Sequence, residues 1–98
     1  MKYKVLIVDK EEKVLCTLKK ILEQETYIVE TVQSTVDALE MVKSDKCHIV
    51  LIEIDMPDMN GIELLKEIKN YDALTQVIMM TEHSTMEKIL SSLEYGAN

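Results

Sequence analysis

The sequence lacks the long apolar segments, glycine- or proline-rich tracts and internal repeats that mark membrane, linker and repeat proteins. Its longest apolar runs, Val5–Val8 and Ile49–Ile52, are far too short to cross a bilayer, and no signal-peptide pattern opens the chain. One proline and two glycines do not make a flexible linker. The 98 residues, of which 47% are hydrophobic, therefore predict one domain over residues 1–98 with no membrane partner.

The charge and the cysteine content exclude two further classes of ligand. The net charge of −7 would repel a phosphate backbone, so we expect no nucleic acid to bind and expect contacts with other proteins instead. Cys16 and Cys47 lack the spacing of metal ligands. Cys16 falls on the predicted buried side of a helix and Cys47 precedes a strand, which predicts free structural thiols in a reducing cytoplasm.

Strand-like and helix-like segments alternate strictly along the chain. Continuous apolar runs predict strands buried on both faces at Lys4–Val8, Ile49–Ile54 and Val77–Thr81, and a more alternating run predicts an edge strand at Tyr27–Val32. Amphipathic helices are predicted after each of these strands. Their expected core residues are Val14, Leu15, Leu18, Ile21 and Leu22; then Val36, Leu39 and Val42; then Ile62, Leu65 and Ile68; and last Met86, Ile89, Leu90 and Leu93. Their expected caps are Ser34 with Asp37, Asn60 with Glu63, Ser84 with Glu87, and Gly96 at the end of the last helix.

This alternation predicts an α/β fold with a parallel sheet, because right-handed crossovers return the chain to the same side of one sheet. The simplest strand order is 2-1-3-4. Ligands and chemistry collect at the carboxyl ends of parallel strands, so that edge is the candidate site. The residues expected to meet there are Asp9, Lys10, Glu53, Asp55 and Thr81, with Asp58 nearby as a solvated loop acid.

Four segments match one known family in order and spacing. They are Val-Leu-Ile-Val-Asp at Val5–Asp9, Asp-Met-Pro-Asp-Met-Asn-Gly-Ile-Glu-Leu-Leu-Lys at Asp55–Lys66, Val-Ile-Met-Met-Thr at Val77–Thr81, and Gly-Ala at 96–97. Together they resemble the receiver domain of two-component response regulators over essentially the whole chain. The resemblance implies a flavodoxin-like fold and a role in phosphorelay signalling. A typical receiver takes a phosphoryl group from a histidine kinase onto an aspartate that ends its third strand, assisted by a magnesium ion.

The candidate site departs from that family at the positions on which this chemistry depends. Asp9 matches the first of two acids that follow the first strand, but Lys10 stands at the position of the second. Glu53 stands at the phosphoacceptor position in place of aspartate. Asp55 matches the residue whose backbone carbonyl binds the metal in the family, and Thr81 matches the hydroxyl that acts as a switch.

Lys10 and Glu53 change what the site can do. Lys10 removes one negative ligand and adds a positive charge, and Mg²⁺ rarely binds without carboxylates placed for it. Two opposite charges roughly 4 Å apart attract by about 4 kcal/mol at an effective dielectric constant of about 20, before desolvation is subtracted. We therefore hypothesise that the Lys10 ammonium replaces the metal and pairs with Glu53. The chain would then be a non-enzymatic signalling module that needs neither phosphorylation nor a cofactor. A Lys10 side chain that points to solvent is the alternative geometry.

Three other functions remain open at the level of the sequence, one of them a non-signalling fragment whose only role is assembly. Another is a functional phosphoacceptor, in which Glu53 or Asp55 takes a phosphoryl group from a histidine kinase with Mg²⁺ as cofactor. The third is a small flavodoxin-like enzyme or nucleotide-binding protein. That function is disfavoured, because acids follow the first strand at Asp9–Glu12 where a phosphate site needs a glycine-rich loop.

The predicted sheet lacks the outer strand that the resemblance implies. The sequence ends at Asn98, before the family's fifth strand, its fifth helix and the lysine that lies between them. Val77–Met80 would then be an exposed apolar sheet edge, and such edges pair readily with other chains. Either the sequence is a piece of a longer regulator, or a partner molecule closes the gap, for example a second copy of this chain.

Overall fold

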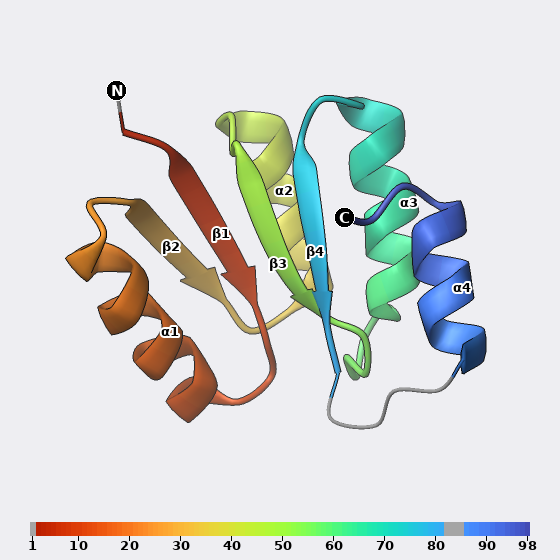
Figure 1. The fold of residues 1–98 in the computed structure, drawn as a ribbon, viewed down its shortest axis with the longest axis horizontal. Coiled ribbons are helices and arrows are strands. Elements are labelled where there is room, and N and C mark those ends of the chain that lie inside the picture. Colours follow the sequence, from red (N-terminus) through yellow and green to blue (C-terminus); the bar gives the residue numbers. More distant parts are fainter. Residues whose placement is uncertain (1, 82–85) are drawn as a thin grey trace.

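The computed structural model describes residues 2–81 and 86–98, except for the side chains of residues 86–89. Within these residues the chain alternates strands and helices, as predicted (Figure 1). In order, the elements are β1 (Lys4–Val8), α1 (Glu12–Gln24), β2 (Ile28–Val32), α2 (Thr35–Ser44), β3 (Ile49–Glu53), α3 (Gly61–Tyr71), β4 (Gln76–Met80) and α4 (Met86–Glu94).

The strands form a parallel sheet in the order β2-β1-β3-β4, which confirms the predicted topology and the predicted edge position of β2. In the register, Val8 pairs with both Val32 and Ile52, and Glu53 pairs with Met80. The carboxyl ends of β1, β3 and β4 therefore lie level with one another. That alignment brings the candidate residues to one edge of the sheet.

The core forms two clusters because side chains alternate across a strand. On one face α2 and α3 pack against all four strands, and the buried residues are Leu6, Val8, Val50, Ile52 and Val77 from the sheet and Ala38, Val42, Leu64, Leu65 and Ile68 from the helices. On the other face Leu15 of α1 packs on Val5, Ile7 and Val29, so α1 covers mainly β1 and β2. None of the described helices covers the β4 half of this face, and Ile78 there is 41% exposed.

The caps that begin and end the helices agree only in part with the prediction. The Ser34 hydroxyl accepts a hydrogen bond from the backbone N–H of Asp37 at 3.1 Å, and Gly96 has a positive φ of 93°, both as expected. Asn60 caps α3 through the backbone N–H of Ile62 at 2.8 Å. Glu63 does not return to this cap but pairs with Lys66 at 3.4 Å. The predicted Ser84–Glu87 cap lies outside the described residues.

The predicted core residues Leu15, Val42, Leu65 and Ile68 are buried, but several other side chains predicted to be buried are exposed. On α1 Leu15 is buried as predicted, whereas Cys16 and Ile21 are exposed. On α2 the buried residues are Thr35, Ala38 and Val42, so Val36 is exposed. On α4 the small Ser92 is buried, whereas Leu90 and Leu93 are each 58% exposed.

The prediction that β4 is buried on both faces is also wrong, since it forms an edge of the sheet and exposes Ile78. The alternative expectation of an exposed apolar edge is met instead. Among the described residues, no helix has the length and apolar character needed to span a membrane.

Candidate functional site

Buried carboxylates lie at the carboxyl edge of the sheet. Asp9 directly follows β1 and is 5% exposed, and Glu53 is the last residue of β3 and is 7% exposed. Thr81 directly follows β4. The register places these positions at the ends of three adjacent strands, in agreement with the expected convergence. Burying an ionised carboxylate is unfavourable unless hydrogen bonds compensate it. The hydrogen-bond partners of Asp9 and Glu53 therefore determine what the site can do.

Each of the two carboxylates accepts a hydrogen bond from the backbone two residues later. Asp9 Oδ1 accepts from the N–H of Glu11 at 2.8 Å, and Glu53 Oε1 accepts from the N–H of Asp55 at 3.0 Å. Such local turns fix the orientation of a side chain relative to its own loop. The Glu53 carboxylate is therefore held against the loop that follows β3.

The Lys10 ammonium binds that same loop. Its Nζ donates to the backbone carbonyl of Asp55 at 2.8 Å, while the Lys10 carbonyl accepts from the side chain of Gln33 at 3.3 Å. Over residues 2–81 and 86–98, no ion pair joins Lys10 to Glu53, so the predicted salt bridge is wrong. The Lys10 ammonium instead donates to the carbonyl of Asp55, while Glu53 accepts from the N–H of the same residue.

The donor set does not fit the magnesium ion that the family resemblance implies. Mg²⁺ needs near-octahedral oxygen ligands, commonly with one or two carboxylates. The described residues contain no group of three or more His, Cys, Asp or Glu side chains that could hold a metal. The Asp55 carbonyl, which the resemblance assigns to the metal, is bonded to an ammonium that would repel a divalent cation.

The loop between β3 and α3 is fixed tightly against the end of β3. The backbone N–H of Gly61 donates to the carbonyl of Ile54 at 2.8 Å. A Cβ atom at residue 61 would lie 2.4 Å from the carbonyl oxygen of Glu53 and 2.8 Å from the Cα of Ile54. Only glycine permits this approach, because both neighbours are backbone atoms that cannot move aside.

Asp58 anchors the same loop to the amino terminus of α2, which the sequence did not predict. Its carboxylate accepts from the backbone N–H groups of Thr35 at 3.1 Å and Val36 at 3.2 Å, and the Thr35 hydroxyl accepts from the N–H of Met59 at 3.1 Å. Burial would raise the pKa of Asp58, but hydrogen bonds from the Thr35 hydroxyl and from the backbone of Val36, Met59 and Thr35 lower it to about 2. Asp58 is exposed in the loop, as predicted, but it is also a structural contact that the sequence did not reveal.

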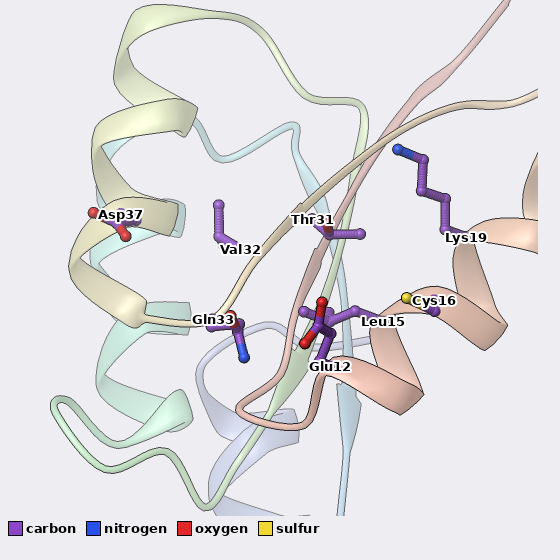
Figure 2. Close-up of a pocket in the computed structure, with 8 residues that line it drawn as sticks. All are labelled: Glu12, Leu15, Cys16, Lys19, Thr31, Val32, Gln33 and Asp37. Atoms are coloured by element: carbon purple, nitrogen blue, oxygen red, sulfur yellow. The ribbon is translucent and has the colours of Figure 1, made fainter.

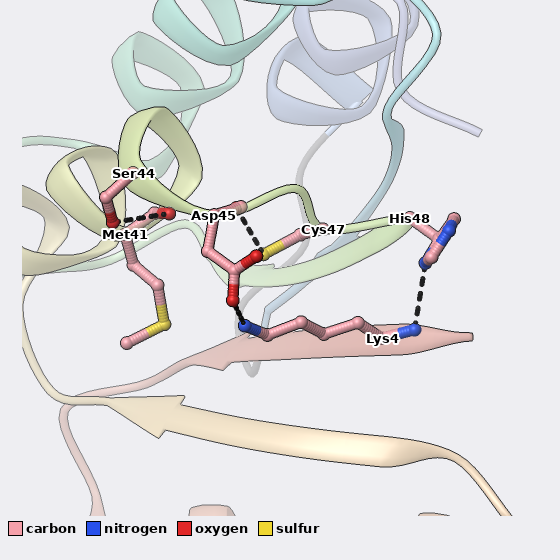
Figure 3. A network of polar contacts seen from close by, with 6 residues as sticks. All are labelled: Lys4, Met41, Ser44, Asp45, Cys47 and His48. Atoms are coloured by element: carbon pink, nitrogen blue, oxygen red, sulfur yellow. Dashed lines mark hydrogen bonds and ion pairs between the residues drawn. The ribbon is translucent and has the colours of Figure 1, made fainter. Parts of the chain in front are cut away.

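A second polar network lies at the opposite, amino-terminal edge of the sheet (Figure 3). The Lys4 ammonium forms an ion pair with Asp45, and the backbone N–H of Lys4 donates to Nδ1 of His48 at 2.9 Å. The hydrogen bond with Asp45 raises the pKa of Lys4, and the same bond lowers the pKa of Asp45. Burial raises the pKa of the Cys47 thiol beside them. This network joins β1 to the start of β3 and is remote from Glu53.

A cavity of about 440 Å³ lies between α1, the end of β2 and the start of α2 (Figure 2). Its lining side chains carry charges of both signs and include the exposed thiol of Cys16. None of the candidate residues Asp9, Lys10, Glu53, Asp55 or Thr81 lines it. The candidate site is therefore a set of side chains at the sheet edge and not this cavity.

Comparison with known proteins gives a consistent result. A family model described as the response regulator receiver domain matches residues 5–98. The chain is 37% identical over 98 residues to the chemotaxis protein CheY of Halobacterium salinarum, which covers 100% of this chain and 82% of that protein. It matches the crystal structure of a CheY-like response regulator receiver domain protein from Methanospirillum hungatei with a TM-score of 0.97 and 32% identity, covering 100% of this chain and 78% of that one. It matches the beryllofluoride-activated NtrC4 receiver domain dimer with a TM-score of 0.91 and 29% identity, covering 96% and 78% of the two chains.

Proposed function

This chain belongs to the response regulator receiver domain family of two-component systems, and from that premise we propose that its site signals without being phosphorylated. The Lys10 ammonium would stand in for the metal, and Glu53 would supply a permanent negative charge beside Thr81. The module would act through protein contacts in the cytoplasm and would have no catalytic activity of its own. Its partner would be a histidine kinase or another signalling protein.

The observation that carries this proposal is the bond of 2.8 Å between Lys10 Nζ and the Asp55 carbonyl. Phosphoryl transfer depends almost entirely on positioning and on the neutralisation of charge around the transferred group. A single ammonium, with one of its three N–H groups bonded to the Asp55 carbonyl, supplies less positive charge than a divalent ion. The acceptor is also displaced, because glutamate reaches one methylene further than aspartate and Glu53 Oε1 is bonded to the N–H of Asp55 at 3.0 Å.

The alternative is a working phosphoacceptor that uses Glu53 or Asp55 with Mg²⁺. The buried Asp9 carboxylate favours it, because this acid of the family's pair is retained at the same sheet edge as Glu53. Family membership favours it as well. The two proposals differ in whether a covalent phosphoryl group forms.

Incubation with acetyl phosphate and Mg²⁺, followed by intact-mass spectrometry, separates the two proposals. We expect no gain of a phosphoryl group in the natural chain. The matched variant carries Lys10→Asp and Glu53→Asp together, which restores the acids of the family pattern, and we expect it to gain one. Phosphorylation of the natural chain, or magnesium binding tighter than millimolar in a calorimetric titration, would refute the proposal.

Association of two copies through the open edge of β4 is a further way in which the module could act. The edge position of β4 and the exposure of Ile78 support such a contact. Sedimentation equilibrium over a range of concentrations tests it. A monomer at all concentrations would exclude a second copy as the partner.

A further inference from the structure

The cavity of about 440 Å³ beside α1 has the size of a site for a small molecule (Figure 2). It lies at the carboxyl end of the edge strand β2, with α1 on one side and the start of α2 on the other. Sites for small molecules in proteins usually measure roughly 300–1,000 Å³. All of its lining residues fall within residues 12–37, so the cavity is independent of the open side of the sheet at β4.

One wall of the cavity is a stripe of α1 that carries opposite charges at its two ends. Glu12, Leu15 and Lys19 follow one another at spacings of three and four residues, so they share one face of the helix. Leu15 is buried, and the side chains of Glu12 and Lys19 leave α1 on the side that faces β2 (Figure 2). At a rise of 1.5 Å per residue, these two charged residues are about 10 Å apart along the helix axis.

The charges around the cavity have no partners in the protein. Glu12 and Lys19 are too far apart along α1 to pair with each other, since pairs on a helix are three or four residues apart. In the part of the chain that the structure describes, neither of them forms an ion pair with another residue, and neither does Asp37 on the opposite wall. Charges that line a cavity without partners are available to a ligand.

The acids and the lysine lie at different ends of the cavity. Glu12 is in the first turn of α1 and Asp37 is in the first turn of α2. Both helices begin where parallel strands end, so both acids lie toward the carboxyl edge of the sheet. Lys19 lies two turns further along α1. The cavity is therefore negative at one end, positive at the other, and apolar between them, where Leu15 and Val32 line it.

Gln33 connects the cavity to the candidate site at the sheet edge. It lines the cavity, and its Nε2 donates to the backbone carbonyl of Lys10 at 3.3 Å. A molecule that fills the cavity would contact Gln33, and the backbone of Lys10 should therefore report on its presence.

We propose that this cavity binds a small zwitterion whose ammonium and carboxylate groups are separated by an apolar chain. The ammonium would lie toward Glu12 and Asp37, the carboxylate would lie against Lys19, and the chain would cover Leu15. Each part of such a ligand meets a group of complementary charge or polarity. A nucleotide or another polyanion would place negative charge against the two acids, and a dication would place positive charge against Lys19.

The probe is 6-aminohexanoate, which carries both charges at the ends of a methylene chain, and its matched controls are hexanoate and hexylammonium. In a titration of the natural chain followed by amide chemical shifts, we expect saturable binding with a Kd on the order of millimolar. Each control lacks one charge, so it should bind roughly fivefold more weakly, the effect of losing one partly exposed ion pair. The shift changes should centre on Leu15, Thr31 and Gln33 and extend to Lys10.

Lys19→Met tests the positive end of the cavity, with Lys20→Met as its matched control. Lys20 is exposed on α1 and does not line the cavity. Methionine preserves the length and the helix propensity of the lysine side chain, and circular dichroism establishes that both variants are folded. Lys19→Met should bind 6-aminohexanoate no more tightly than hexylammonium, whereas Lys20→Met should keep the preference of the natural chain.

Glu12→Gln tests the negative end in the same way. We expect it to reduce the preference for 6-aminohexanoate over hexanoate, because one of the two acids at that end is lost. Glu23→Gln, an exposed position further along α1 and outside the cavity, should leave the preference unchanged.

The thiol of Cys16 provides a second measurement that requires no variant. It is exposed and lines the cavity, within one turn of both Glu12 and Lys19. A ligand in the cavity should slow its alkylation by iodoacetamide, by roughly tenfold when 6-aminohexanoate is present at about ten times its Kd. Hexanoate and hexylammonium at the same concentration should slow the reaction less.

Three results would overturn the inference. One is the absence of saturable binding of 6-aminohexanoate well above the millimolar range, and another is a set of shift changes that maps away from the cavity. The third is equal affinity for 6-aminohexanoate, hexanoate and hexylammonium, because the charges of the cavity would then select nothing. None of these measurements involves phosphorylation at Glu53, so each result leaves the proposed function of that site untouched.

Discussion

For replacement of Gly61 by alanine, the structure predicts a loss of stability, whereas helix propensity predicts a gain. Gly61 opens α3, where replacement of glycine by alanine would ordinarily stabilise a helix by up to about 1 kcal/mol. In this fold the new Cβ would lie 2.4 Å from the Glu53 carbonyl oxygen and 2.8 Å from the Cα of Ile54. Since both are backbone atoms, the loop itself must move, and the bond of 2.8 Å from the Gly61 N–H to Ile54 would be strained or lost.

We therefore expect Gly61→Ala to destabilise the protein by about 2 kcal/mol. Overpacking at a rigid site costs roughly 1–3 kcal/mol, and the hydrogen bond contributes about 1 kcal/mol, from which the propensity gain is subtracted. Urea denaturation followed by circular dichroism measures the change, at an unchanged dependence on urea concentration. For a domain of this size the melting temperature should fall by roughly 10 °C.

Gly96→Ala is the matched control at the other glycine. Its new Cβ would meet only the flexible Lys69 side chain, at 3.4 Å, although the φ of 93° disfavours any side chain. We expect a loss of about 1 kcal/mol, from the cost of a left-handed conformation. Amide shifts at Asp9 and Asp55 should change in Gly61→Ala and stay constant in Gly96→Ala. A neutral or stabilising effect of Gly61→Ala would show that the loop is not held against β3 as described.

Two further predictions concern titration and thiol chemistry. Because the folded pKa of Asp58 is about 2 and lies below its unfolded value of about 3.9, its contribution to stability is complete above pH ~4 and is lost as the pH falls through ~2. Asp58→Asn should therefore flatten the acid limb of a melting-temperature profile between these values, and an unchanged limb would contradict the role of Asp58 as an anchor. Cys16 is exposed and Cys47 is buried with a raised pKa, so a thiol reagent should modify Cys16 rapidly and Cys47 only on unfolding. Equal rates for the two thiols in the folded protein would contradict the burial of Cys47.

The topology was predictable from the sequence because local patterns and general connection rules are enough to determine it. Continuous apolar runs separated by amphipathic helices indicate parallel strands, and the strand ends then determine which residues share an edge. This is why Asp9, Glu53 and Thr81 are found where they were expected.

The contacts within the site were less predictable, because they depend on choices between competing partners. Lys10 could bond to the Glu53 carboxylate or to the Asp55 carbonyl, and no sequence pattern distinguishes these acceptors. Asp58 bonds to residues 22 and 23 positions earlier, at a helix terminus that a local pattern does not reveal. The buried stripes of α2 and α4 depend on the neighbours of each helix, so Val36 and Leu93 were misplaced.

The bond from Lys10 to the Asp55 carbonyl has a consequence for how such a module would be controlled. A metal ion or a phosphoryl group can be added and removed, whereas an ammonium on a side chain is present for the lifetime of the polypeptide. Neither a chelator nor a phosphatase would then remove the positive charge from this site. If the proposed function holds, the signal would change with the amount of the protein and with the partners it meets, and not with a chemical mark on each molecule.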